Sequence, residues 1–114
     1  MHIVVNHLTR MREGFICVAG VDLETRQHVR PVQVSQLGNH LLARNGGPFD
    51  MAAVIDLGAV QFAGVTPEVE DHRFGLYAVR REGFYAPTTF WTLLQQMKSY
   101  TSSTELFCRM SLTP

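Results

Sequence analysis

The stretch FICVAGVDLETRQHVRPVQV, residues 15–34, decides the fold of this chain. Its first part, residues 15–21, is an almost unbroken apolar run. It is short for a helix and rich in β-branched and aromatic side chains, which predicts a strand covered on both faces. Residues 22–26 supply polar side chains for a reversal, and residues 27–34 return to strand character. We therefore expect a buried β-hairpin.

Pro31 lies inside the second arm of this hairpin. Proline has no backbone N–H to donate, so it is confined to a strand edge, a bulge or the end of a strand. We expect the second arm to bend or to leave the sheet at this position.

Outward from the hairpin, strand-like segments alternate with polar connections. Further strands are expected at residues 2–8, 51–62, 76–81 and 105–112, and the second of these is expected to be interrupted or bulged at Gly58. The connections at residues 9–14, 35–48 and 64–75 are rich in polar residues, glycine and proline, which indicates loops.

The period of the apolar residues changes after residue 87. Thr88 or Thr89 is a suitable N-cap, and apolar residues then recur at the spacing of an amphipathic helix, at Phe90, Leu93, Leu94 and Met97. Trp91 lies one position off this stripe, so it either widens the apolar face or lies at an interface, and we favour packing into the core.

Length and composition restrict the class of protein. The 114 residues are enough for one domain, residues 1–114, with 46% hydrophobic and 18% charged side chains. Ten basic and ten acidic residues cancel, which argues against strong non-specific binding to nucleic acid but allows a local basic patch. We find no leader and no apolar run of membrane-spanning length, so we expect a cytoplasmic protein without a membrane partner.

These elements predict a mainly β fold: a small antiparallel barrel or curled sheet of five to six strands, with one amphipathic helix near the C-terminus. The succession of a first strand, Cys17-Val18-Ala19-Gly20, a turn and Val29-Arg30-Pro31-Val32 resembles the start of the bacterial dual OB-containing domain family, over roughly residues 1–98. The resemblance implies an OB-like barrel and no particular activity. His28 stands where the family pattern has tryptophan, and the length leads us to expect one OB unit or an abbreviated version.

Catalytic signatures are weak. The histidines at positions 2, 7, 28, 40 and 72 belong to no recognisable nucleophile, metal or paired-carboxylate motif, and Asp56 has no evident charged companion in the sequence. Two cysteines, Cys17 and Cys108, form no CxxC or Cys/His cluster. We therefore expect no catalytic residue, metal or cofactor, and an enzyme is the least favoured class.

The leading hypothesis is a non-catalytic binding module for single-stranded nucleic acid, either DNA or RNA. Arginines suit phosphate contacts and exposed rings suit base stacking. The candidate phosphate contacts are Arg10, Arg12, Arg30, Arg80 and Arg81, and the candidate stacking residues are His28, Phe84 and Tyr85. The alternative is a protein-interaction or oligomerisation module, either a homodimer or a subunit of a larger assembly, which pairs through its sheet edges.

Overall fold

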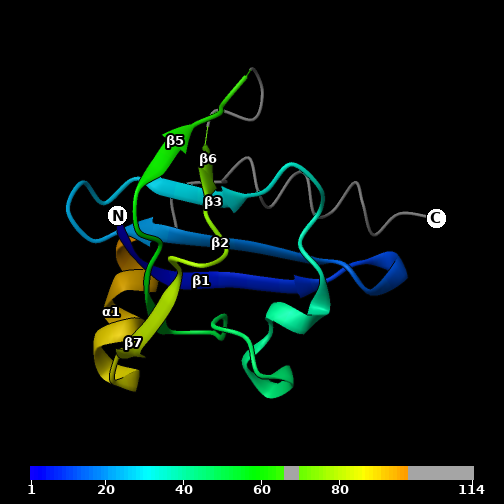
Figure 1. Cartoon of the computed structure of the whole chain (residues 1–114). Coiled ribbons are helices and arrows are strands. Elements are labelled where there is room, and N and C mark those ends of the chain that lie inside the picture. The colour runs from blue at the N-terminus through cyan, green and yellow to red at the C-terminus, as the bar shows by residue number, and fades with distance from the viewer. Residues whose placement is uncertain (66–69, 98–114) are drawn as a thin grey trace.

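The computed structural model describes residues 1–65 and 70–97. Within these residues the chain forms a curled, half-barrel-like β-sheet flanked by one α-helix (Figure 1). The elements are β1 (His2–Arg10), β2 (Ile16–Asp22), β3 (His28–Val32), β4 (Ala53–Asp56), β5 (Val60–Phe62), β6 (Asp71–Phe74), β7 (Arg80–Phe84) and α1 (Pro87–Met97), with short 3-10 turns at Arg12–Gly14, Asn39–Leu41 and Ala43–Asn45.

The predicted hairpin is confirmed and lies near the middle of the sheet. The seven strands of the described residues are ordered β5-β6-β3-β2-β1-β4-β7, so β2 is paired on both sides. All residues of β2 before Asp22 are buried. The turn after β2 is closed by the Asp22 carboxylate, whose Oδ1 accepts the backbone N–H of Glu24 at 2.8 Å.

Within the described residues the sheet is mixed and has seven strands, which corrects the prediction of an antiparallel sheet of five to six strands. β3 pairs with β6 in parallel, whereas the other neighbouring strands are antiparallel. β6 lies in the segment 64–75 that the sequence indicated as a loop, because its residues Asp71, His72 and Arg73 carry no apolar alternation. Pro31 pairs with His72 in this parallel ladder, and β3 ends one residue later.

The strand expected at residues 51–62 is interrupted at Gly58, one of the two predicted alternatives, and its halves are two strands on opposite sides of the sheet. β4 pairs with β1 and β7, whereas β5 pairs only with β6 at the far edge. Gly58 has a φ of +70°, a conformation that side chains rarely adopt, and it lets the chain turn away between the two strands. The expected strand at 76–81 likewise begins later, at Arg80, after a turn closed by the Ala78 N–H and the Gly75 carbonyl at 3.1 Å.

Two apolar clusters hold the fold together. The larger one fills the inside of the curl and centres on fully buried residues such as Ile3, Ile55 and Phe49. The smaller one lies between the sheet and α1, where Leu93 packs with Val4 and Val21. The predicted helix is therefore confirmed as a flanking element. It begins at Pro87, so Thr88 and Thr89 lie inside its first turn and the prediction that one of them is the N-cap is wrong.

Trp91, on this helix, is 62% exposed, so the prediction that it packs into the core is wrong. The strand expected at residues 105–112 lies outside the described residues. Within the residues that the structure describes, no helix has the length and apolar character needed to cross a membrane.

Candidate functional site

Two groups of polar side chains stand out in the described structure. One surrounds the segment 43–50, which we call the rim loop. The other lies on the helix-bearing face of the sheet, near the start of β1, and we call it the His2 cluster; it comprises His2, Asp56 and Glu82.

The rim loop is held in one shape by its own backbone. The N–H groups of Asn45 and Gly47 both donate to the Leu42 carbonyl at 2.9 Å, and the N–H of Ala43 donates to the Phe49 carbonyl at 2.8 Å. Phe49 is fully buried and packs edge-on against Phe74. The loop is therefore a firm support for its side chains, and these N–H groups are not free to cradle a phosphate.

Three arginine side chains lie in or beside the rim loop. Arg10, at the end of β1, and Arg44, in the loop, are both exposed and line one hollow of about 230 Å³. Arg81 of β7 donates to the carbonyls of Gly47 and Pro48 at 3.3 and 3.5 Å. Within the described residues, none of the three forms an ion pair. Asp50, which lines the same hollow, is the opposing charge there.

An aromatic ring lies beside these cations. The guanidinium carbon of Arg81 is 5.5 Å from the ring centroid of Phe84, and the Phe84 side chain is 55% exposed at the end of β7. A cation over a ring face is attracted to it, and this contact positions both groups. The arrangement presents a charged and a stacking group side by side.

Several predicted contact residues lie elsewhere. Arg30 is buried and forms a two-point ion pair with Asp71, at 2.6 and 2.7 Å, so its guanidinium does not face solvent. Tyr85 is half-buried and packs against the cluster beneath α1. His28 is half-buried at the start of β3, and Arg12 is exposed in the turn after β1.

Arg80 pairs with Asp56 of the His2 cluster and does not contact the rim loop. Of the predicted nucleic-acid contacts, three lie in or beside the rim loop: Arg10, Arg81 and Phe84. Arg44 was missed, because an arginine in a glycine-rich loop carries no periodic signal.

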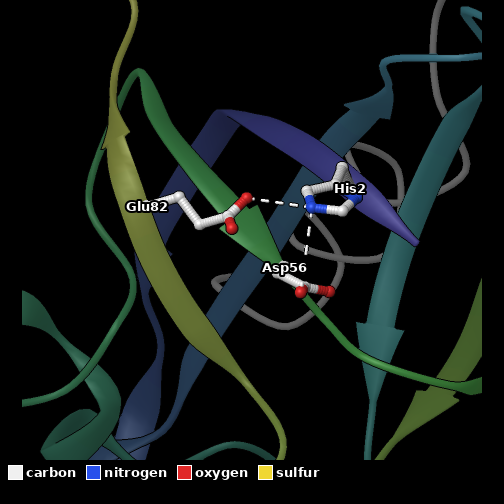
Figure 2. Close-up of side chains that lie close together, drawn as sticks. All are labelled: His2, Asp56 and Glu82. Carbon is white, nitrogen blue, oxygen red and sulfur yellow. Dashed lines mark ion pairs between the residues drawn. The ribbon is translucent and has the colours of Figure 1, made fainter.

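The His2 cluster is built across three adjacent strands (Figure 2). His2 of β1 is opposite Asp56 of β4 in the ladder, and Asp56 is opposite Arg80 of β7. The register slips between Val54 and Ile55, which leaves Glu82 as the extra residue of a β-bulge on β7. In the structure the side chain of Glu82 points at the imidazole.

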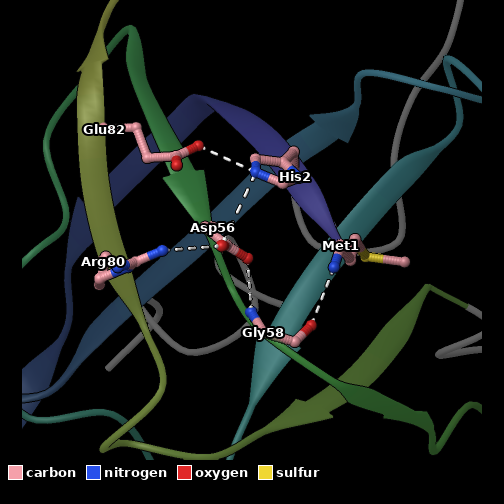
Figure 3. Close-up of polar contacts among 6 residues, drawn as sticks. All are labelled: Met1, His2, Asp56, Gly58, Arg80 and Glu82. Carbon is pink, nitrogen blue, oxygen red and sulfur yellow. Dashed lines mark hydrogen bonds and ion pairs between the residues drawn. The ribbon is translucent and has the colours of Figure 1, made fainter.

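The distances within the cluster are short. His2 Nε2 lies 2.9 Å from Glu82 Oε1 and 3.7 Å from Asp56 Oδ2. Arg80 Nη2 is 3.6 Å from the same Asp56 oxygen, as Figure 3 shows. Asp56 Oδ1 accepts the Gly58 N–H at 2.8 Å, and the Gly58 carbonyl accepts the Met1 amine at 2.8 Å.

These contacts keep Asp56 ionised. The hydrogen bond from the Gly58 N–H lowers the pKa of Asp56 below its ordinary value of 3.8, and the positive charges of His2, Met1 and Arg80 act in the same direction. Partial burial opposes the shift and is outweighed. The cluster thus presents a firmly negative carboxylate beside an imidazole nitrogen.

The chain was compared with family models, curated proteins and solved structures. None of the three comparisons found a match. The rim loop and the His2 cluster are therefore the two features from which a function can be inferred.

Proposed function

We propose that this protein is a non-catalytic module that binds single-stranded nucleic acid at the rim loop. Two observations carry the proposal. Arg10 and Arg44 line one hollow at the rim loop, and Arg81 contacts the Gly47 and Pro48 carbonyls of the same loop. None of the three has an ion-pair partner in the described structure. Guanidinium groups bind phosphate oxygens with paired hydrogen bonds, and a loop of fixed shape sets their spacing.

Phe84 supplies the second half of the recognition. A single-stranded chain exposes the faces of its bases, and stacking on an aromatic ring stabilises a bound base by about 1–3 kcal/mol. With the Arg81 guanidinium 5.5 Å from the Phe84 ring centroid, one nucleotide can place its base on Phe84 and its phosphate near Arg81. Stacked bases in a duplex offer no such face, which favours single strands.

Modest affinity is expected from the charges. The net charge is zero, so binding depends on the local arginines and not on a long-range positive field. We expect dissociation constants of about 10⁻⁴–10⁻⁶ M at physiological salt, the range of binding dominated by phosphates.

The test is fluorescence anisotropy with labelled single-stranded DNA, single-stranded RNA and duplex DNA, at about 50 and 200 mM salt. We expect both single strands to bind more tightly than the duplex, and the logarithm of affinity to fall linearly with the logarithm of salt concentration. Equal binding of duplex and single strands, or no binding at the lower salt, would contradict the proposal.

A pair of matched variants ties the binding to the loop. Replacing Arg10 and Arg44 with alanine should weaken single-strand binding and reduce the salt slope by about 0.7 for each phosphate that is no longer neutralised. Replacing Arg26 and Arg73 removes the same charge from exposed positions elsewhere, in the β2–β3 turn and on β6. Equal reductions of affinity in the two double variants would show that charge alone, and not the rim loop, determines binding.

A second candidate function is pairing with another protein through β7. This strand is an edge of the described sheet, and an edge strand offers backbone groups to a partner strand. The exposed side chain of Phe84 lies at the end of this strand. Sedimentation velocity tests it: a dimer that ignores nucleic acid would favour pairing, and a monomer that binds single strands would favour the first proposal.

A further inference from the structure

The His2 cluster supports an inference independent of nucleic-acid binding. Its imidazole Nε2, one Asp56 oxygen and one Glu82 oxygen all lie within 4.8 Å of one another. The set is mixed, one nitrogen and two carboxylate oxygens, and the imidazole nitrogen is paired with both carboxylates (Figure 2). Divalent first-row transition-metal ions are commonly coordinated by such sets of imidazole and carboxylate ligands.

We propose that His2, Asp56 and Glu82 bind a divalent transition-metal ion such as Zn²⁺ or Mn²⁺. A metal with ligand bonds of about 2.1 Å holds neighbouring ligand atoms about 3.0 Å apart in octahedral geometry and about 3.4 Å apart in tetrahedral geometry. The observed separations from His2 Nε2 are 2.9 Å to Glu82 and 3.7 Å to Asp56. The Glu82 separation already matches the octahedral value, and the Asp56 side chain must rotate toward the imidazole to share the ion.

The sheet itself positions the ligands. His2 and Asp56 are direct partners in the β1–β4 ladder, which fixes the spacing of their backbones. The bulge in β7 adds Glu82 to the same group, and bulges commonly re-aim a side chain beside a functional site. The Gly58 N–H holds Asp56 Oδ1 at 2.8 Å, so the other oxygen of this carboxylate faces the imidazole.

Accessibility fits a site that an ion can enter from solvent. The side chains of His2 and Glu82 are 49% and 41% exposed, and that of Asp56 is 19% exposed. Three protein ligands leave further coordination positions to water or to a second molecule.

Arg80 competes with the metal for Asp56. Its Nη2 is 3.6 Å from Asp56 Oδ2, and its side chain is 72% exposed. An exposed ion pair of this kind is weak, so the guanidinium can move into solvent when an ion binds. Replacing Arg80 with alanine should therefore strengthen metal binding, whereas a purely structural ion-pair network would gain nothing from that change.

The experiment is isothermal titration of the full chain with ZnCl₂, MnCl₂ and MgCl₂. We expect Zn²⁺ and Mn²⁺ to bind with one ion per chain, and Mg²⁺, which prefers oxygen ligands and retains its water, to bind more weakly. Glu82→Gln and Asp56→Asn should each raise the Zn²⁺ dissociation constant by at least about 10-fold, because removal of a direct ligand should cost no less than removal of an outer partner.

Controls separate coordination from charge and from folding. Glu13→Gln removes the same charge from an exposed turn beyond the other end of β1 and should leave the Zn²⁺ dissociation constant unchanged. Circular dichroism of each metal-free variant checks the fold, and Glu82→Gln, at a solvent-exposed bulge, tests the site even if Asp56→Asn does not fold.

Two results would overturn the inference. The first is that Glu82→Gln and the control Glu13→Gln change the Zn²⁺ dissociation constant equally. The second is that added Mn²⁺ leaves the backbone amide resonances of residues 2, 56 and 82 sharp in nuclear magnetic resonance spectra. That result would place the ion elsewhere.

Discussion

At the scale of single residues, Arg30 shows how differently two neighbouring arginines can act. Arg30 is 8% exposed and pairs with Asp71 through two hydrogen bonds, whereas Arg73, two residues beyond Asp71, is exposed. The pair joins β3 to the parallel strand β6, where Arg30 and Asp71 are opposite each other. Arg30 therefore stabilises the pairing of β3 with β6 and is not available to bind a ligand.

Replacing Arg30 with alanine should lower the free energy of unfolding by about 3–5 kcal/mol, because Asp71 would be left as a buried, uncompensated charge. Arg73→Ala is the matched control and should change it by less than about 0.5 kcal/mol. Urea unfolding monitored by circular dichroism measures both. Similar small effects of the two variants would contradict the burial of the pair.

Asp56 gives a prediction in pH. Because its pKa in the folded protein lies below the ordinary value of 3.8, the ionised carboxylate stabilises the fold above about pH 4, and this contribution disappears as the pH falls through the folded-state pKa. Asp56→Asn cannot lose a charge on acidification. The stability difference between wild type and Asp56→Asn should therefore be largest above about pH 5 and shrink toward about pH 2.5 in urea unfolding. A difference that stays constant with pH would contradict the lowered pKa.

From the sequence, it was easier to predict which side chains are exposed than to predict which side chains contact each other. Sequence reasoning identified Arg10, Arg81 and Phe84 as available for binding, and the structure leaves all three exposed at one feature. It described Asp56 as lacking a charged companion, because His2, Arg80 and Glu82 become its neighbours only through the pairing of β1, β4 and β7. A partner set by strand register has no signature in the linear order of residues.

At the scale of elements, the rim loop depends on a close backbone approach at Gly47. A Cβ atom added there would lie 2.2 Å from the Leu41 carbonyl carbon and oxygen, too close for any side chain. The loop must therefore shift if Gly47 is replaced, and with it the carbonyl that Arg81 contacts.

We predict that Gly47→Ala lowers the free energy of unfolding by about 1–3 kcal/mol and also weakens single-strand binding. Gly75→Ala is the control, because no heavy atom lies within 4 Å of a Cβ at that position. Thermal unfolding and anisotropy measure the two effects. Unchanged single-strand affinity in a folded Gly47→Ala variant would separate the loop from the binding surface.

The helix α1 offers a comparison of two apolar side chains. Leu93 is 3% exposed and packs with Val4 and Val21, whereas Trp91 is 62% exposed. Leu93→Ala should cost about 2–5 kcal/mol through the cavity it leaves. Trp91→Ala, although it removes more atoms, should cost only about 0.5 kcal/mol in the same urea titration. If Trp91→Ala destabilised the protein more than Leu93→Ala, α1 would pack against the sheet through the face that carries Trp91 and not the face that carries Leu93.

Elements with a strong local pattern were predictable. The apolar run of β2 and the amphipathic stripe of α1 each follow from side-chain periodicity, and both are confirmed. β6 and the placement of β4 and β5 on opposite sides of the sheet were not predictable. β6 has a polar sequence and is stabilised by its parallel partner β3, while β4 and β5 look like one apolar run until Gly58 turns the chain.

At the scale of the whole molecule, the strand order determines which surfaces exist. β1 and β4 lie side by side near one end of the sheet order, and β7 is the edge strand next to them. The rim loop receives arginines from β1 and β7, and the His2 cluster uses all three of these strands. The arginine-bordered loop and the carboxylate and imidazole cluster thus share strands β1 and β7, with Arg10 at the end of β1 and His2 at its start.

The central claim is that single-stranded nucleic acid binds at the rim loop. The most direct measurement is a titration of isotopically labelled protein with a short single-stranded oligonucleotide, followed by nuclear magnetic resonance of the backbone amides and arginine Nε–H groups. We predict that the largest shifts occur at Arg10, Arg44, Arg81 and Phe84, while Arg26 and Arg73 stay unchanged. Shifts centred on Arg26 and Arg73, or shifts spread evenly over all exposed arginines, would contradict binding at the rim loop.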